Sequence, residues 1–222
     1  MTDKHARPMT EATIKHHLDE ATLLAYAAGT LPEAFNLIVA THLSLCDTCR
    51  ASAQAYDAVG GALLDDDAAA MTAGSLDQIL AQLDNGFDAP ARHVSTSDIP
   101  TPLHSYIGDD LESIRWRPVG MGVKQAILRT SKGATARLLS IPAGAAMPDH
   151  GHHGTEMTLV LKGAFQDDDA YFGRGDIEIA DSDVQHIPVA DIHEDCICLA
   201  VTDAPLRFQG ILPRIWQKFV RI

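Results

Sequence analysis

The chain has 222 residues, of which 46% are hydrophobic and 21% are charged, a composition typical of one large or two small folded domains. Its net charge is −13, from 17 Lys and Arg against 30 Asp and Glu. This balance argues against a protein that binds nucleic acid on its own by neutralising phosphates. Residues 1–90 carry four basic and thirteen acidic side chains, a net charge of −9, so the acidity is mostly N-terminal and points to a basic partner or to none.

The sequence contains eleven histidines and four cysteines, which are residue types that commonly bind metals. The cysteines form two close pairs, Cys46/Cys49 and Cys196/Cys198. The start of the chain lacks the basic and apolar regions of a signal peptide, and no segment approaches the ~18 apolar residues of a membrane span. We therefore expect a cytoplasmic protein with no membrane association, in which paired thiols favour metal ligation over disulfides.

Helical spacing of apolar residues dominates residues 18–85. Asp19 is a suitable cap for a first helix, and Pro32 followed by Glu33 is typical of the start of a second one. The expected helices cover 19–29, 32–45, 47–64 and 75–84. The last of these is amphipathic, and two roles stay open for it: it closes the helical bundle, or its apolar edge docks into a groove of a partner.

A connector rich in proline follows at residues 86–103, with little apolar content, and we expect it to be exposed. Beyond it the pattern changes to short strands separated by turns, which favours a barrel or sandwich. The expected strands cover 124–128, 136–141, 156–161, 177–179, 196–201 and 206–211. The sequence thus predicts two domains, an all-α helical bundle at 1–87 and an all-β barrel at 104–222, joined by a linker at 88–103.

The helical part contains the string H-x3-C-x2-C, formed by His42, Cys46 and Cys49. A separation of four residues places His42 and Cys46 on one face of a helix, and Cys-x2-Cys across a turn brings two thiolates to one ion. A closed tetrahedral zinc site needs a fourth ligand. The upstream candidates are His5, His16 and His17.

The second part contains G-x5-H-x-H-x3-E-x6-G, in which His150, His152 and Glu156 hold the His and Glu positions. This string is similar to the first motif of the cupin barrels. His186 stands where the second cupin motif has its histidine, although the rest of that motif departs from the pattern at Asp181, Asp183 and Ala190. Three imidazoles and a carboxylate suit Zn, Mn, Fe, Ni or Cu, so residue type does not choose the metal.

The stretch HHLDEATLLAYAAGTLPEAFNLIVATHLSLCDTCR resembles the zinc-binding domain of ChrR-type anti-sigma factors, and the resemblance continues through the cupin-like part. It implies that His17 is the fourth ligand beside His42, Cys46 and Cys49. It also implies that zinc occupies the cupin site, and that the helical domain binds an extracytoplasmic-function (ECF) sigma factor and covers the surfaces this factor needs for core RNA polymerase. The implied stimulus is singlet oxygen or a related oxidant.

Our main hypothesis is a cytoplasmic anti-sigma factor without enzymatic activity, which sequesters one ECF sigma factor per chain and does not bind nucleic acid directly. The cupin domain would sense or relay an oxidative signal. One alternative is a metal-dependent cupin dioxygenase or isomerase with an accessory zinc domain. Another is a zinc-dependent DNA-binding regulator, which the lack of a basic recognition helix disfavours.

Two further groups of residues have simpler interpretations. Cys196 and Cys198 lie two apart on an apolar strand, where an internal disulfide would be strained. They are interpreted either as buried core thiols or as thiols near the barrel metal that are oxidised during sensing. The acidic runs 65–67 and 167–169 are interpreted as solvated loops.

Overall fold

The computed structural model describes residues 13–66, 69–84, 99–108, 110–168 and 170–208. As predicted, the N-terminal half is helical, and the Asp19 side chain caps the first helix by accepting a hydrogen bond from Thr22 N at 2.7 Å. None of the described helices is both long enough and apolar enough to cross a bilayer. The helices of this half are α1 (Glu20–Ala27), α2 (Glu33–Leu45), α3 (Asp47–Asp66) and α4 (Ser75–Asp84).

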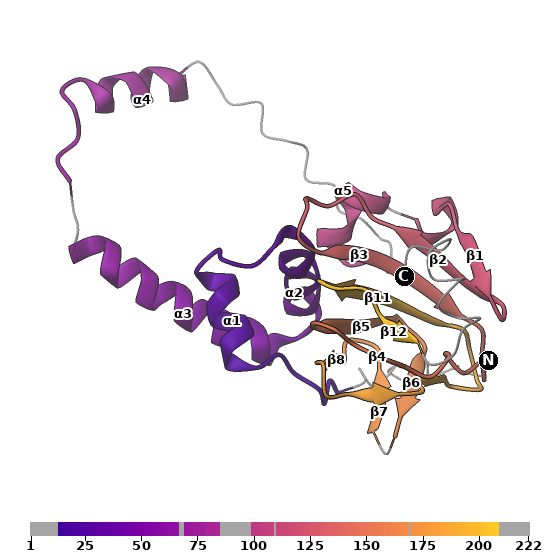
Figure 1. Cartoon of the computed structure of the whole chain (residues 1–222). Helices are drawn as coiled ribbons and strands as arrows, with labels where there is room; N and C mark the ends of the chain where they lie inside the picture. The colour runs from indigo at the N-terminus through magenta and orange to yellow at the C-terminus, as the bar shows by residue number, and fades with distance from the viewer. Residues whose placement is uncertain (1–12, 67–68, 85–98, 109, 169, 209–222) are drawn as a thin grey trace, which may run out of the picture.

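The second half is built from antiparallel strands, preceded by three short helical turns. A six-stranded sheet has the order β1-β2-β3-β11-β5-β8, and two three-stranded sheets have the orders β10-β6-β7 and β12-β4-β9 (Figure 1). The turns are η1 (Thr101–Leu103), α5 (His104–Ile107) and η2 (Leu111–Ser113). The strands are β1 (Arg117–Gly120), β2 (Val123–Ile127), β3 (Thr135–Ile141), β4 (His150–Gly151), β5 (Glu156–Lys162), β6 (Ala164–Asp167), β7 (Ala170–Gly173), β8 (Ile177–Ala180), β9 (Gln185–His186), β10 (Val189–Ala190), β11 (Cys196–Thr202) and β12 (Arg207–Phe208).

Every strand expected from the sequence has a counterpart in the structure. The expected strand at 206–211 is seen over Arg207–Phe208, and its last three residues lie outside the described residues. The architecture is the predicted one, N-terminal helices followed by a cupin-like β domain.

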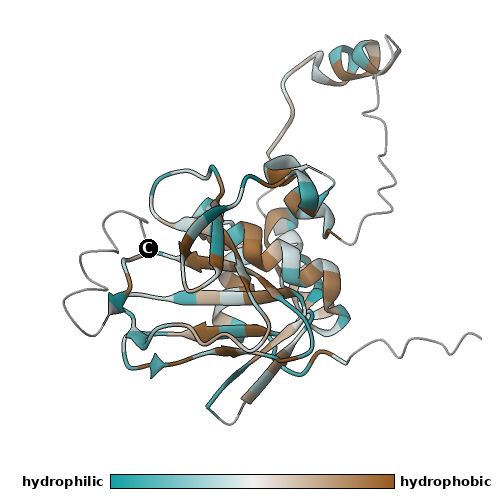
Figure 2. Cartoon of the chain, turned by 90° about the vertical axis from the view of Figure 1, so that its right-hand side faces the viewer, coloured by the Kyte–Doolittle hydropathy of each residue, from teal (hydrophilic) through white to brown (hydrophobic). Residues whose placement is uncertain are grey.

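The central strands β3, β11 and β5 of the six-stranded sheet are buried on both faces. Because side chains alternate along a strand, one face points into the barrel and carries Arg137, Glu156 and Cys198. The other face packs against α2, so that Leu138 and Leu199 share one apolar core with residues of the N-terminal half. Figure 2 shows hydrophobic residues, in brown, on the helices next to the sheet. Helix α2 therefore belongs to the core of both halves.

A polar contact at the start of α2 also joins the two halves. Glu33 accepts hydrogen bonds from the Tyr106 hydroxyl at 2.8 Å and from the Ser131 backbone N–H at 2.6 Å.

Two residues of the expected exposed connector are packed against the core, since Ile99 is 6% exposed and Leu103 is fully buried. That expectation of exposure was wrong at this end of the connector, because its few apolar residues pack into the shared core.

Candidate metal centres

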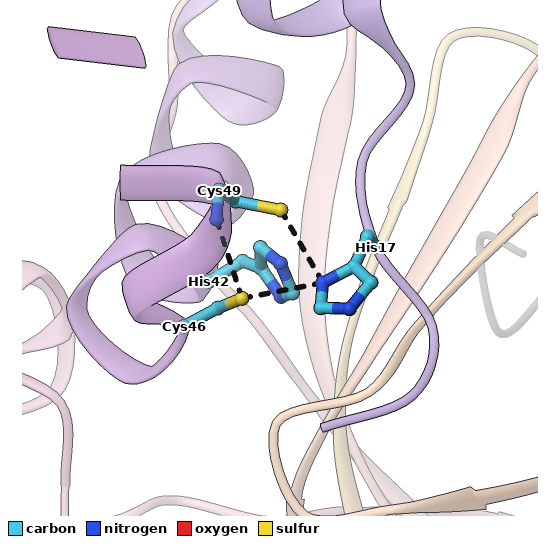
Figure 3. Close-up of side chains that lie close together, drawn as sticks. All are labelled: His17, His42, Cys46 and Cys49. Carbon is cyan, nitrogen blue, oxygen red and sulfur yellow. Dashed lines mark hydrogen bonds between the residues drawn. The ribbon is translucent and has the colours of Figure 1, made fainter. Parts of the chain in front are cut away.

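The first cluster lies where α2 ends and α3 begins. Cys46 follows the last residue of α2 and Cys49 lies in the first turn of α3, as the H-x3-C-x2-C spacing predicts. His17 comes from the extended segment before α1 and faces both sulfurs from the opposite side (Figure 3). Its Nδ1 lies 3.3 Å from Cys46 Sγ and 3.6 Å from Cys49 Sγ. His42 completes a group in which all ligand atoms lie within 4.8 Å of one another.

These separations fit a tetrahedral zinc ion. With Zn–S near 2.3 Å and Zn–N near 2.0 Å, the sulfur and nitrogen ligands of a tetrahedron stand about 3.5 Å apart. Of the other two candidates, His16 has its ring against Phe172 instead, and His5 lies outside the described residues. Of the upstream histidines that the structure describes, His17 is the one brought to the cysteines.

The protonation of the cluster also suits a metal. His42 donates a hydrogen bond from Nδ1 to the Gly175 carbonyl at 2.9 Å, while its Nε2 is buried without a hydrogen-bond partner. Burial lowers the pKa of His42 to about 4, so the ring is neutral at physiological pH. Burial also raises the pKa of Cys49 to about 11. A cation would satisfy the orphaned Nε2 and would displace the thiol proton.

The second cluster lies inside the β domain. His150, His152 and His186 are all buried, and their ligand nitrogens lie within 4.8 Å of one another. The Nε2 atoms of His152 and His186 are 3.1 Å apart, close to the roughly 3.3 Å between two nitrogens bound to one tetrahedral zinc ion. His150 donates from Nδ1 to the Pro148 carbonyl at 2.8 Å, so the ring proton of His150 lies on Nδ1.

Glu156 lies beside these rings, with its Oε2 3.2 Å from His152 Nδ1. Both atoms are buried without a hydrogen-bond partner, and a cation bound by the Glu156 carboxylate would satisfy its Oε2. Burial opposes the ionisation of Glu156, but the neighbouring His152, His150 and Arg137 outweigh it and keep the pKa below its ordinary value. The carboxylate is therefore available as a metal ligand.

Two acidic residues that the sequence did not point to lie beside the Nδ1 atom of His186. Asp167 accepts a hydrogen bond from His186 Nδ1 at 2.7 Å, and Glu178 Oε1 lies 3.8 Å from the same nitrogen. The prediction of a solvated loop at 167–169 was thus wrong for Asp167, which is 8% exposed. Burial and the neighbouring Asp167 raise the pKa of Glu178 to about 9, so it is protonated at neutral pH. Carboxylates in this position orient metal-binding imidazoles.

The second cysteine pair is buried in the same barrel. The sulfurs of Cys196 and Cys198 lie 3.4 Å apart as free thiols. Their mutual hydrogen bond, together with burial, raises the pKa of Cys198 well above its ordinary value. Cys198 and the metal-cluster residues His150 and His186 line one cavity. His153, by contrast, is exposed.

Comparison with known proteins places this architecture in a family. Residues 106–205 match the model of the ChrR cupin-like domain. The anti-sigma-E factor ChrR of Cereibacter sphaeroides is 58% identical over 213 residues, which cover 95% of this chain and 100% of the relative. A crystal structure of Rhodobacter sphaeroides SigE in complex with the anti-sigma factor ChrR matches with a TM-score of 0.77 and 57% identity, and the match covers 86% of this chain and 100% of the matched one. The chain belongs to the ChrR family of anti-sigma factors.

Proposed function

We propose that this chain binds one ECF-type sigma factor through its helical half and holds it away from core RNA polymerase. The relative of known structure was crystallised with its own sigma factor, SigE. The feature of this chain that supports the proposal best is the exposed apolar face of α4.

Helix α4 presents an apolar face that the rest of the described chain leaves open. Its four large apolar side chains recur at helical spacing and are about half exposed: Leu76 60%, Ile79 49%, Leu80 49% and Leu83 52%. The C-terminal part of α3 continues this exposure, with Leu63 at 66% and Leu64 at 76%. Figure 1 shows α4 standing away from the sheet. An exposed amphipathic helix of this kind is suited to the groove of a protein partner.

Charge indicates the chemistry of that partner. Residues 51–90 contain seven Asp and no Lys, Arg or Glu, so the apolar face belongs to a uniformly acidic segment. Apolar contacts supply affinity, while complementary charge accelerates encounter and selects the partner. The surface therefore fits a partner with a basic rim around an apolar groove, such as a sigma factor whose own function is to bind DNA.

The metal centres complete the proposal. Zinc at His17, His42, Cys46 and Cys49 would tie the segment before α1 to the junction of α2 and α3, and would stabilise the helices in their binding arrangement. A divalent metal, zinc by family resemblance, would be held by His150, His152, Glu156 and His186. We assign to this second centre the sensing of an oxidant such as singlet oxygen, with residues 88–103 as the linker between a helical domain at 1–87 and a cupin domain at 104–222, in a cytoplasmic protein.

Replacing an apolar residue of α4 by an acidic one tests the proposed sigma-binding surface. The full chain is co-expressed with candidate ECF sigma factors, and complex formation is measured by co-elution and by titration. Leu80→Asp should weaken the complex at least tenfold, about 1.4 kcal/mol, because it buries a carboxylate in an apolar contact. Met121→Asp is the matched control, since Met121 is 70% exposed on the β domain. Equal affinities of the two variants for the sigma factor would exclude α4 as the docking surface.

An enzymatic function remains the second candidate, and the cavity in the barrel favours it. This cavity of about 50 Å³ is lined by His150, Glu156 and His186 among others. It has room for about three or four water molecules, enough for dioxygen or a compact substrate at the metal. Consumption of dioxygen together with an organic substrate by the iron-loaded chain would establish this function. Failure to turn over in any metal-loaded form would exclude it.

A further inference from the structure

The turn between β7 and β8 of the cupin half contacts the metal centre of the helical half. Its residue Gly175 accepts the hydrogen bond from His42 Nδ1 at 2.9 Å. This bond fixes the tautomer of the ring, because Nδ1 carries the proton and Nε2 is left bare for a metal. A group 133 residues away in the sequence thus sets the state of one zinc-site histidine.

The next residue of the same turn, Asp176, holds the segment that carries His17. Asp176 is 4% exposed. Its Oδ1 accepts hydrogen bonds from Lys15 N at 2.6 Å and from His16 N at 2.9 Å, while its Oδ2 accepts one from Gly173 N at 2.9 Å. One buried carboxylate therefore joins the two backbone amides directly before His17 to its own turn.

Packing on the other side of the turn leaves little room for movement. Gly175 has φ +89°, and a Cβ at this position would lie 2.6 Å from Ile14 Cδ1. The His16 carbonyl accepts a hydrogen bond from Ile177 N at 3.4 Å, and the His16 ring lies 4.2 Å from the ring of Phe172. The described residues 13–18 of the segment belong to no helix or strand, and these contacts with the cupin half hold them in place.

We propose that Asp176 and Gly175 are positioning residues of the N-terminal metal centre, through which the cupin half sets the metal affinity of the helical half. The inference rests on the proposed zinc site at His17, His42, Cys46 and Cys49. Groups that orient metal ligands in this way typically change metal affinity by about 10–100-fold when removed.

The same turn also connects the two centres. Strand β8 begins directly after Asp176 and carries Glu178, which lies 3.8 Å from His186 of the second cluster. The turn is fixed to the barrel by hydrogen bonds between Gly175 N and the Val160 carbonyl at 2.8 Å and between Val160 N and the Asp176 carbonyl at 3.1 Å. A shift of β8 caused by a change at the second cluster therefore moves the groups that hold His17 and His42.

Cobalt loading of the full-length chain tests the proposal. Only the first centre contains thiolate ligands, so thiolate-to-cobalt charge-transfer absorption reports on that centre and not on the cupin site. Asp176→Asn replaces the carboxylate by an amide of the same size, and should weaken cobalt binding at the thiolate centre about 10–100-fold, with cobalt at the cupin site bound as in the wild type. Asp181→Asn is the matched control, because Asp181 also accepts a backbone N–H, that of Asp183 at 2.9 Å, but in an exposed turn.

A second measurement does not depend on the folding of a variant. Hydrogen exchange of the wild-type chain is compared before and after the thiolate centre is loaded, because coupling between two sites acts in both directions. Loading should slow exchange at Gly173 and Ile177, whose amides flank the turn and bond to Asp176 and to the His16 carbonyl. The inference would be overturned if Asp176→Asn bound cobalt with the same affinity as the wild type. It would also be overturned if hydrogen exchange at these two amides were unchanged by loading the thiolate centre. Absence of the charge-transfer band in the wild type would instead refute the proposed thiolate site.

Discussion

Replacing Ile38 of α2 by alanine should destabilise the helical and the β half of the chain together. Ile38 is fully buried in the core that α2 shares with the sheet. The substitution removes three buried carbons, about 2.4 kcal/mol at roughly 0.8 kcal/mol each. The cavity left behind adds to this loss, so we expect a total of about 3–4 kcal/mol, within the range found for such substitutions.

Urea unfolding with two probes measures this effect. Far-UV circular dichroism follows the helices, and tryptophan fluorescence follows the β half through Trp116, which directly precedes β1. With an m-value of about 2 kcal/mol/M, both midpoints should fall by about 1.5–2 M. The matched control is Ile79→Ala, since Ile79 is 49% exposed and its loss should cost below about 0.5 kcal/mol. A fluorescence midpoint that stays in place while the dichroism midpoint falls would refute the shared core.

Three further changes test separate parts of the structure. Asp167→Asn should weaken zinc binding at the cupin centre about 10–100-fold, measured by chelator competition, because it loosens His186; unchanged affinity would contradict this role. The Ser131 and Tyr106 hydrogen bonds lower the pKa of Glu33 below 4.5, so Glu33→Gln should reduce the melting temperature above pH 4.5, with the difference vanishing as the pH falls through the lowered value. Equal melting temperatures at pH 7 would exclude that contribution. The Cys198 thiol should resist alkylation at pH 8 until the chain is denatured, as peptide mass spectrometry would show, and rapid native labelling would contradict its burial and raised pKa.

Local patterns predicted the parts of the fold that depend on neighbouring residues. The Asp19 cap, the helix break at Cys46 and the apolar strand that carries Cys196 and Cys198 follow from patterns over a few residues, and the structure confirms all three. Three residues of the first cluster were predictable for the same reason, since His42, Cys46 and Cys49 lie within one helix end and one turn, whereas the choice of His17 rests on family resemblance.

The groups that hold the ligands could not be predicted in this way. Asp167 belongs to an acidic run that suggests solvent, and only the strand alternation of buried Phe165, exposed Gln166 and buried Asp167 points inward. Glu178 lies between two isoleucines, which suggests an exposed polar face. The isoleucines instead pack against the core shared with the helices. The Glu178 side chain therefore points the opposite way from the one that the sequence suggests. The contacts of Gly175 and Asp176 with residues 15, 16 and 42 join segments more than 130 residues apart.

The most direct test of the central claim is inhibition of sigma-dependent transcription in vitro. The purified, zinc-loaded chain is titrated into a run-off reaction containing core RNA polymerase and the cognate ECF sigma factor. Transcription should fall to background at one chain per sigma factor, and a Cys46→Ser, Cys49→Ser double variant should inhibit poorly because its helices lose the metal that holds them together. Full transcription in the presence of excess zinc-loaded chain would contradict the assignment of this protein as an anti-sigma factor.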